Sequence, residues 1–168
     1  MPEKRAAEFD VLIKLKKEKA KMLKNIPSII SPELLKVLME MGHGDEIVIA
    51  DGNFPGAAMA KRLIRLDGHG VPEVLDAVLK LMPLDSYTKQ PAGLMKLMDC
   101  DVGKINPVIW DKYAEIVAKY EPAAAAAGFE AIDRFEFYER AKNVYAVVMT
   151  GETAVYANII LKKGVVTE

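Results

Sequence analysis

Cysteine, histidine and long apolar runs are scarce in this sequence, and each scarcity excludes a class of protein. Cys100 is the only cysteine among 168 residues, which excludes an internal disulfide and a zinc site built from cysteines, and which suits a reducing compartment. No stretch approaches the roughly 20 apolar residues of a membrane-spanning helix, and no signal peptide opens the chain. We therefore expect a soluble, cytoplasmic protein without a membrane partner.

An excess of charge of either sign is absent as well. The 23 Lys and Arg residues nearly balance the 24 Asp and Glu residues, which gives no reason to expect nucleic acid as a partner and leaves small neutral ligands open. The length of 168 residues suits one domain with a substantial core. Residues 1–21 are dense in Lys and Glu, and we interpret them as a charged extension before a domain of residues 22–168.

Several segments combine the apolar spacing of a helix with residues that begin or end one. In "SPELLKVLMEMGHG", Ser31 is a suitable N-cap and Pro32 suits the first helical position. The segment "GVPEVLDAVLKLMPL" repeats this pattern and stops at Pro83. A third helix is predicted in "INPVIWDKYAEIVAKYEP", followed by a short alanine-rich piece that ends at Gly128.

Strands are predicted by three β-branched apolar runs, which are "EIVIAD" early in the chain, and "VYAVVMTG" and "VYANIILKKG" near its end. Helix and strand signals alternate in the first part of the chain, and strand signals cluster in the last part. This order predicts an α/β fold: a single-domain sandwich with a central, mostly parallel sheet flanked by helices.

The stretch "MGHGDEIVIADGNFP", residues 41–55, places His43 between two glycines before the first predicted strand and Asp51 directly after that strand. Proteins of the α/β class often bind ligands at such strand ends. The glycines would equally suit a tight turn in which His43 only caps the preceding helix. A metal site would need more ligands than this stretch and the distant His69 supply, and the glycine-rich phosphate-binding motifs are absent.

Polar and aromatic residues alternate in the segment "RFEFYER", which predicts an extended strand with two different faces. Arg134 and Tyr138 would share one face of this strand, and Phe135 and Phe137 would pack on the other. The polar face suits either a solvent-exposed edge or the wall of a binding site.

A second polar pair interrupts the apolar run "VYANII", where the same alternation puts Tyr156 and Asn158 on one side of a strand. Buried polar groups of this kind need hydrogen-bond partners. Asp51 and Asp85 each follow a predicted element, and their carboxylates can either bond to their own turns or bind a polar ligand.

Several of these stretches, taken in order, resemble the fucose mutarotase branch of a family that also contains ribose pyranase. They are "SPELLKVLMEMGHGDEIVIADGNFP", "LDSY", "RFEFYERA" and "TGETAVYANIILKKGV", and they run from about Met22 to Val166. The resemblance implies the family's α/β sandwich, a closed homo-oligomer that is often a decameric ring, and active sites near subunit contacts. It also implies interconversion of the α and β anomers of L-fucose without a metal or another cofactor.

The same resemblance assigns residues to this chemistry. His43 and Tyr138 are expected to transfer protons during ring opening and closure, since both side chains suit general acid-base catalysis. The residues matched to sugar contacts are Asp51, Asp85, Arg134, Tyr156 and Asn158. Two alternatives remain open. One is a ribose pyranase, whose branch shares the triplet "YAN", and the other is a non-catalytic sugar-binding protein that keeps the pocket without turnover.

Overall fold

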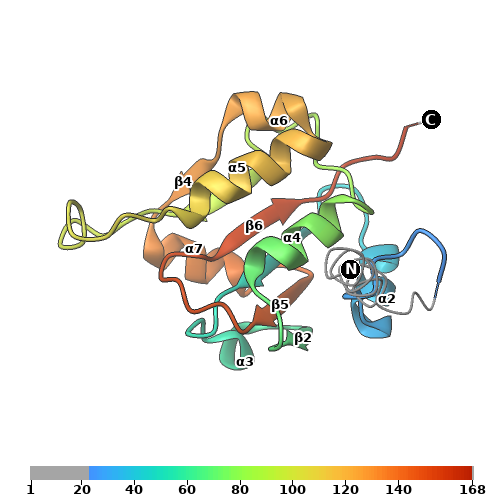
Figure 1. Ribbon diagram of the computed structural model, residues 1–168, viewed down its shortest axis with the longest axis horizontal. Helices are drawn as coiled ribbons and strands as arrows, with labels where there is room; N and C mark the ends of the chain where they lie inside the picture. Colours follow the sequence, from blue (N-terminus) through green and yellow to red (C-terminus); the bar gives the residue numbers. More distant parts are fainter. Residues whose placement is uncertain (1–22, 168) are drawn as a thin grey trace, which may run out of the picture.

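A six-stranded sheet with helices on both faces forms the part of the chain that the computed structural model describes, residues 23–167 (Figure 1). Its strands are β1 (Glu46–Ala50), β2 (Leu63–Leu66), β3 (Ala92–Met95), β4 (Glu130–Ile132), β5 (Ala146–Thr150) and β6 (Ile159–Lys162). The spatial order is β2-β5-β1-β6-β3-β4, and among these strands only β6 runs antiparallel to its neighbours. The predicted α/β fold with a mostly parallel sheet is therefore confirmed, whereas the charged extension, residues 1–21, lies outside the described residues.

The helices cover the two faces of the sheet unequally. One face carries most of them, namely α2 (Pro32–Glu40), α4 (Val71–Leu79), α5 (Ile109–Tyr120) and α6 (Pro122–Ala127), and the other face carries α3 (Gly56–Met59) and α7 (Arg134–Ala141). The predicted cap is present, because the Ser31 hydroxyl accepts the N–H of Leu34 at 3.2 Å. No helix within residues 23–167 has both the length and the apolar character needed to cross a membrane.

The two faces of the sheet belong to two separate hydrophobic clusters. On β1, Ile47 and Ile49 pack under α4 and α5, while Val48 and Ala50 pack toward α7. This alternation follows from the two-residue period of a strand. Because both faces are covered, β1 and β5 are buried along nearly their whole length, which is why their sequences are continuous apolar runs.

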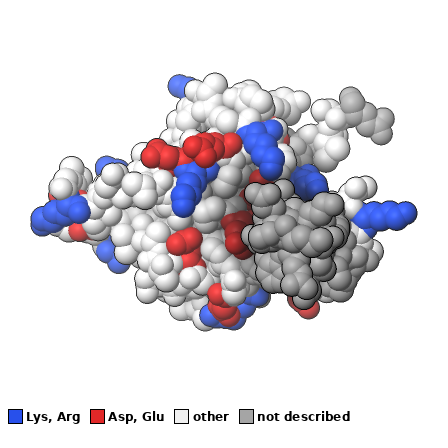
Figure 2. Space-filling model, viewed as in Figure 1, with Lys and Arg blue, Asp and Glu red and all other residues white. Residues whose placement is uncertain are grey.

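Charged side chains are mixed on the surface. On the described part of the face drawn in Figure 2, acidic and basic side chains lie next to one another rather than in separate regions. This distribution agrees with the near-neutral composition and does not resemble the basic face of a nucleic-acid-binding protein.

The predicted strand at "RFEFYER" is wrong, because this segment forms the helix α7 (Arg134–Ala141). Two features of the sequence favour the helix. Glu136 in the first turn and Arg140 in the last turn complement the helix dipole. Phe137 and Ala141, which are four residues apart, are the buried residues of the helix and dock it on the sheet.

The helix changes which side chains share a face. Phe135, predicted to pack with Phe137, is instead 73% exposed. Arg134 and Tyr138 do lie together as predicted, but because residues four apart are neighbours on a helix and not because of strand alternation.

The segment around Tyr156 and Asn158 also differs from the prediction, because β6 begins only at Ile159. Tyr156 has a left-handed backbone with φ of 57°, which lies outside the β region of regular strands. Two aromatic side chains of α5 hold this turn: Trp110 Nε1 donates to the Tyr156 carbonyl, and the Tyr113 hydroxyl donates to the next carbonyl, both at 2.7 Å. The turn is therefore fixed from the side of α5.

Because the segment is a helix, truncation of its two phenylalanines should change the free energy of unfolding by very different amounts. Phe137→Ala should lower the free energy of unfolding by about 3–5 kcal/mol, because it leaves a cavity between α7 and the sheet. Phe135→Ala, at an exposed position, should change it by less than roughly 0.5 kcal/mol. Urea denaturation of both variants at one protomer concentration measures the difference, and equal costs would contradict the assignment.

Candidate active site

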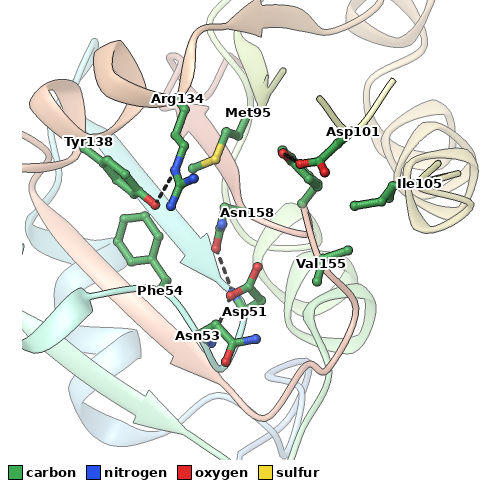
Figure 3. A pocket seen from close by; sticks show the side chains of 11 residues that line it. Asp51, Asn53, Phe54, Met95, Asp101, Ile105, Arg134, Tyr138, Val155 and Asn158 are labelled. Atoms are coloured by element: carbon green, nitrogen blue, oxygen red, sulfur yellow. Dashed lines mark hydrogen bonds between the residues drawn. The ribbon is translucent and has the colours of Figure 1, made fainter. Parts of the chain in front are cut away.

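The structure divides the predicted site residues into two groups at opposite ends of β1. At the carboxyl end, one pocket is lined by Asp51, Arg134, Tyr138, Tyr156 and Asn158 (Figure 3). At the amino end, His43 pairs with Asp85. Within a single chain these residues do not line one pocket, and their shared contact with one sugar stays a prediction.

Side chains from distant parts of the sequence bound the pocket, which has a volume of about 280 Å³. Asp51 comes from the turn after β1, Arg134 and Tyr138 come from α7, Met95 ends β3, and Asp101 belongs to the loop between β3 and α5. In Figure 3 these side chains point toward a common space between α7 and the loops. The mixture of carboxylate, guanidinium, phenol and apolar groups suits a small ligand with several hydroxyl groups.

Asp51 is held in the pocket wall by hydrogen bonds and is 4% exposed. Its carboxylate accepts the backbone N–H of Asn53 at 3.0 Å, and its own N–H donates to Oδ1 of Asn158 at 2.9 Å. Burial raises the pKa of Asp51 above its ordinary value, and the hydrogen bonds from the backbone oppose this rise. The result is a carboxyl group with a fixed position at the end of β1.

Arg134 and Tyr138 form a pair on one face of α7. Nε of Arg134 donates to the Tyr138 hydroxyl at 3.1 Å, and its guanidinium carbon lies 5.6 Å from the centre of the Tyr138 ring. Because the hydroxyl accepts this bond, its own proton is left to donate to a ligand. The adjacent cation also stabilises negative charge that develops on the phenol oxygen.

His43 and Asp85 form the second group. His43 Nε2 lies 3.0 Å from Asp85 Oδ1, and the two side chains are 48% and 6% exposed. The pKa of Asp85 is lowered to about 2, and the largest cause is the hydrogen bond from the Thr88 hydroxyl. The hydrogen bonds from His43 and from the Tyr87 N–H also lower this pKa, whereas burial raises it. An ionised carboxylate only accepts hydrogen bonds, so His43 Nε2 donates and Nδ1 is left to exchange a proton with a ligand.

The antiparallel neighbour β6 shows how far apart the two groups lie. Asn158 precedes β6 at the pocket end, and the carbonyl of Lys163, directly after β6, accepts the N–H of Gly44 beside His43. The five residues of β1 between the two ends span about 16 Å at the usual rise of a strand. One small ligand in the pocket cannot reach His43 of the same chain.

Metal-binding groups are not gathered at either end. Within residues 23–167, no cluster of three or more His, Cys, Asp or Glu side chains could hold a metal ion. The second histidine, His69, contacts Glu73 on α4 at 2.8 Å instead of joining His43.

Several pocket residues were not predicted from the sequence. Asn53 and Phe54 follow Asp51 in the same turn, so their position could have been inferred from its prediction. Asp101 and Ile105 lie in the loop of residues 96–108, whose sequence has no motif that indicates a site. Only the fold brings this loop to the pocket.

Comparisons with known proteins agree with this fold. A sequence model described as the RbsD / FucU transport protein family matches residues 24–166. The human protein named fucose mutarotase is 49% identical over 147 residues, which are 85% of this chain and 94% of the relative. The L-fucose mutarotase of Actinobacillus pleuropneumoniae serotype 5b is 44% identical over 144 residues, covering 86% of this chain and 97% of the relative.

Solved structures show the same relationship. The fucose mutarotase of Streptococcus pneumoniae in complex with L-fucose is 50% identical, with a TM-score of 0.79 over 86% of this chain and 100% of that chain. RbsD of Bacillus subtilis, complexed with D-ribose, is 23% identical with a TM-score of 0.64 over 82% of this chain and 95% of that chain, and it shares the fold. The resemblance inferred from the sequence is confirmed, and the chain belongs to the RbsD / FucU transport protein family.

Proposed function

We propose that this protein is a fucose mutarotase, an isomerase that interconverts the α and β anomers of L-fucose. The observation that carries the proposal is the pocket at the carboxyl end of β1, where a fixed carboxyl group at Asp51 faces the Arg134–Tyr138 pair. Relatives named fucose mutarotase at 44–49% identity, and a solved relative in complex with L-fucose, support the same substrate.

The chemistry of mutarotation requires two proton transfers. One group removes the proton of the anomeric hydroxyl and another protonates the ring oxygen, so that the bond between C1 and the ring oxygen breaks and an open-chain aldehyde forms. Rotation about the bond next to C1 and reclosure by the reverse transfers give the other anomer. Tyr138 and His43 suit these transfers, because the phenol has a proton to donate and the imidazole has a free nitrogen.

Sugar binding is proposed for the remaining matched residues, which are Asp51, Asp85, Arg134, Tyr156 and Asn158. Carboxylate and amide oxygens accept sugar hydroxyls, and a guanidinium donates to sugar oxygens. Both proton transfers can be carried out by side chains acting as general acid and base, so the proposed reaction uses neither a metal nor another cofactor. The exposed, unpaired Cys100 supports a reducing compartment, and we propose the cytoplasm.

The position of His43, about one strand length from the pocket of its own chain, supports a proposal of self-association. We propose a ring-like homo-oligomer, a decamer as in much of the family, in which His43 and Asp85 of one chain complete the pocket of a neighbouring chain. The surface around His43 supports this contact: the Tyr87 ring lies 5.6 Å from the His43 ring and is part of a residue that is 84% exposed. Tyrosine is enriched at interfaces between proteins relative to the rest of the surface.

Saturation-transfer NMR tests the function against its alternatives. In the presence of the protein, saturation of the α-anomer signal of L-fucose should pass to the β-anomer at a rate above the buffer control, and more strongly than for galactose. Faster pyranose–furanose exchange of D-ribose would favour a ribose pyranase, to which Ala157 in the triplet "YAN" points. Fucose binding without any exchange would contradict the enzyme and favour a sugar-binding protein.

Removal of the Tyr138 hydroxyl separates catalysis from binding. Tyr138→Phe should slow anomer exchange by about 10²–10⁴-fold, the usual contribution of a general acid or base, since the proton beside Arg134 is lost. Fucose binding should weaken by only about 0.5–1.5 kcal/mol, the value of one hydrogen bond. Exchange by NMR and affinity by calorimetry provide the two measurements.

The control for this variant is Tyr145→Phe, which deletes a hydroxyl that donates to Glu40 away from the pocket. It should leave both fucose exchange and fucose affinity close to the wild-type values. If Tyr138→Phe slows exchange only as much as it weakens binding, Tyr138 is a contact residue and not a proton-transfer group.

A further inference from the structure

The loop between β3 and α5, residues 96–108, contacts the pocket through Asp101 and Met98. Figure 1 shows this loop projecting from the body of the domain. The Tyr156 hydroxyl lies 2.5 Å from Oδ2 of Asp101 and 3.3 Å from the backbone nitrogen of Met98, from which it accepts. Arg134 Nη1 also contacts the Met98 sulfur at 3.4 Å. The loop therefore meets two of the proposed sugar-binding residues.

Asp101 is itself held in place by the backbone of its loop. Its N–H donates to the Met98 carbonyl at 2.8 Å, and its own carbonyl accepts the N–H groups of Lys104 and Ile105, each at 3.0 Å. These bonds form one tight turn with Asp101 at its centre. The carboxylate is consequently presented to Tyr156 from a defined position, on the side of the pocket away from Tyr138 in Figure 3.

Tyr156 is also constrained from its own backbone. Its φ of 57° is a left-handed conformation that non-glycine residues adopt rarely and at a cost, and that clusters at binding sites. The Trp110 side chain holds the Tyr156 carbonyl at 2.7 Å. Only the hydroxyl end of the side chain then remains to be positioned, and it bonds to the Asp101 carboxylate and to the Met98 N–H.

We propose that Asp101 is a positioning residue for sugar recognition, which acts through the Tyr156 hydroxyl. The Tyr156 hydroxyl donates its single proton in a hydrogen bond to Asp101, and the Met98 N–H donates to one of the two lone pairs of the hydroxyl oxygen. The remaining lone pair can only accept, so Tyr156 recognises a sugar hydroxyl that donates toward it. This inference rests on the proposed function of the pocket, since it concerns the orientation of Tyr156, one of the proposed sugar contacts.

The hydrogen bond from Tyr156 to Asp101 has a spectroscopic signature that does not depend on sugar. The carboxylate is the largest cause that raises the pKa of Tyr156 above the ordinary value for tyrosine. The titration is followed by NMR in protein labelled with ¹³C at the tyrosine ring carbon that carries the hydroxyl. The Tyr156 signal is the one that is missing from the spectrum of the Tyr156→Phe variant. Its titration should move to lower pH in Asp101→Ala.

A double-mutant cycle on L-fucose affinity and exchange tests the role itself. Asp101→Ala and Tyr156→Phe should each weaken fucose binding by about 2- to 12-fold, the range for one hydrogen bond. The double variant should bind no more weakly than Tyr156→Phe alone, because Asp101 acts through the hydroxyl that this change deletes. Asp101→Asn, which keeps an acceptor for the hydroxyl, should lose less affinity than Asp101→Ala.

The matched control is Asp99→Ala, which removes an exposed carboxylate from the same loop outside the pocket. It should leave both fucose affinity and the Tyr156 titration unchanged. With a wild type that is active on fucose, two results would overturn the inference. One is that the affinity losses of Asp101→Ala and Tyr156→Phe add in the double variant, and the other is that Asp101→Ala binds fucose as tightly as Asp99→Ala. A wild-type protein that neither binds nor exchanges fucose would overturn the proposed function and this inference together.

Discussion

The antiparallel pairing of β6 with β1 is the constraint on which the arrangement of both residue groups depends. At one end of this pair, Asn158 reaches the backbone of Asp51 at 2.9 Å and closes the base of the pocket. At the other end, the Lys163 carbonyl accepts the N–H of Gly44 at 2.9 Å and fixes the turn that carries His43. The hydrogen bonds between β1 and β6 thus fix the pocket residues at one end and the turn of His43 at the other. The length of the two strands separates these groups.

Much of the fold could be predicted from the sequence, because long amphipathic segments and buried apolar runs are strong signals. The helices α2, α4 and α5 and the strands β1 and β5 have such signals. The helix α7 was mistaken for a strand, since alternation over "RFEFYER" outweighed its charge pattern and its buried pair, Phe137 and Ala141. The strands β2, β3 and β4 have only three or four residues each, too few to show a period.

The sequence predicted five residues that line the pocket, but not how they are arranged in space. The resemblance identified His43 and Asp51, yet their separation by one five-residue strand already implied that they lie at opposite ends of it. Arg134 and Tyr138 are neighbours through helical spacing, although strand alternation was the stated reason. Asp101 could not be found from the sequence, because only the packing of residues 96–108 beside Tyr156 gives it a role.

We propose that one active site combines His43 of one chain with Tyr138 of its neighbour. Co-expression of His43→Ala and Tyr138→Phe chains with different tags, followed by purification on both tags, isolates mixed assemblies and measures this directly. With equal amounts mixed at random, about a quarter of the contacts between chains pair an intact His43 with an intact Tyr138 pocket, so about a quarter of wild-type fucose exchange should return. If mixed assemblies are as inactive as each variant alone, both residues act within one chain and the account is wrong.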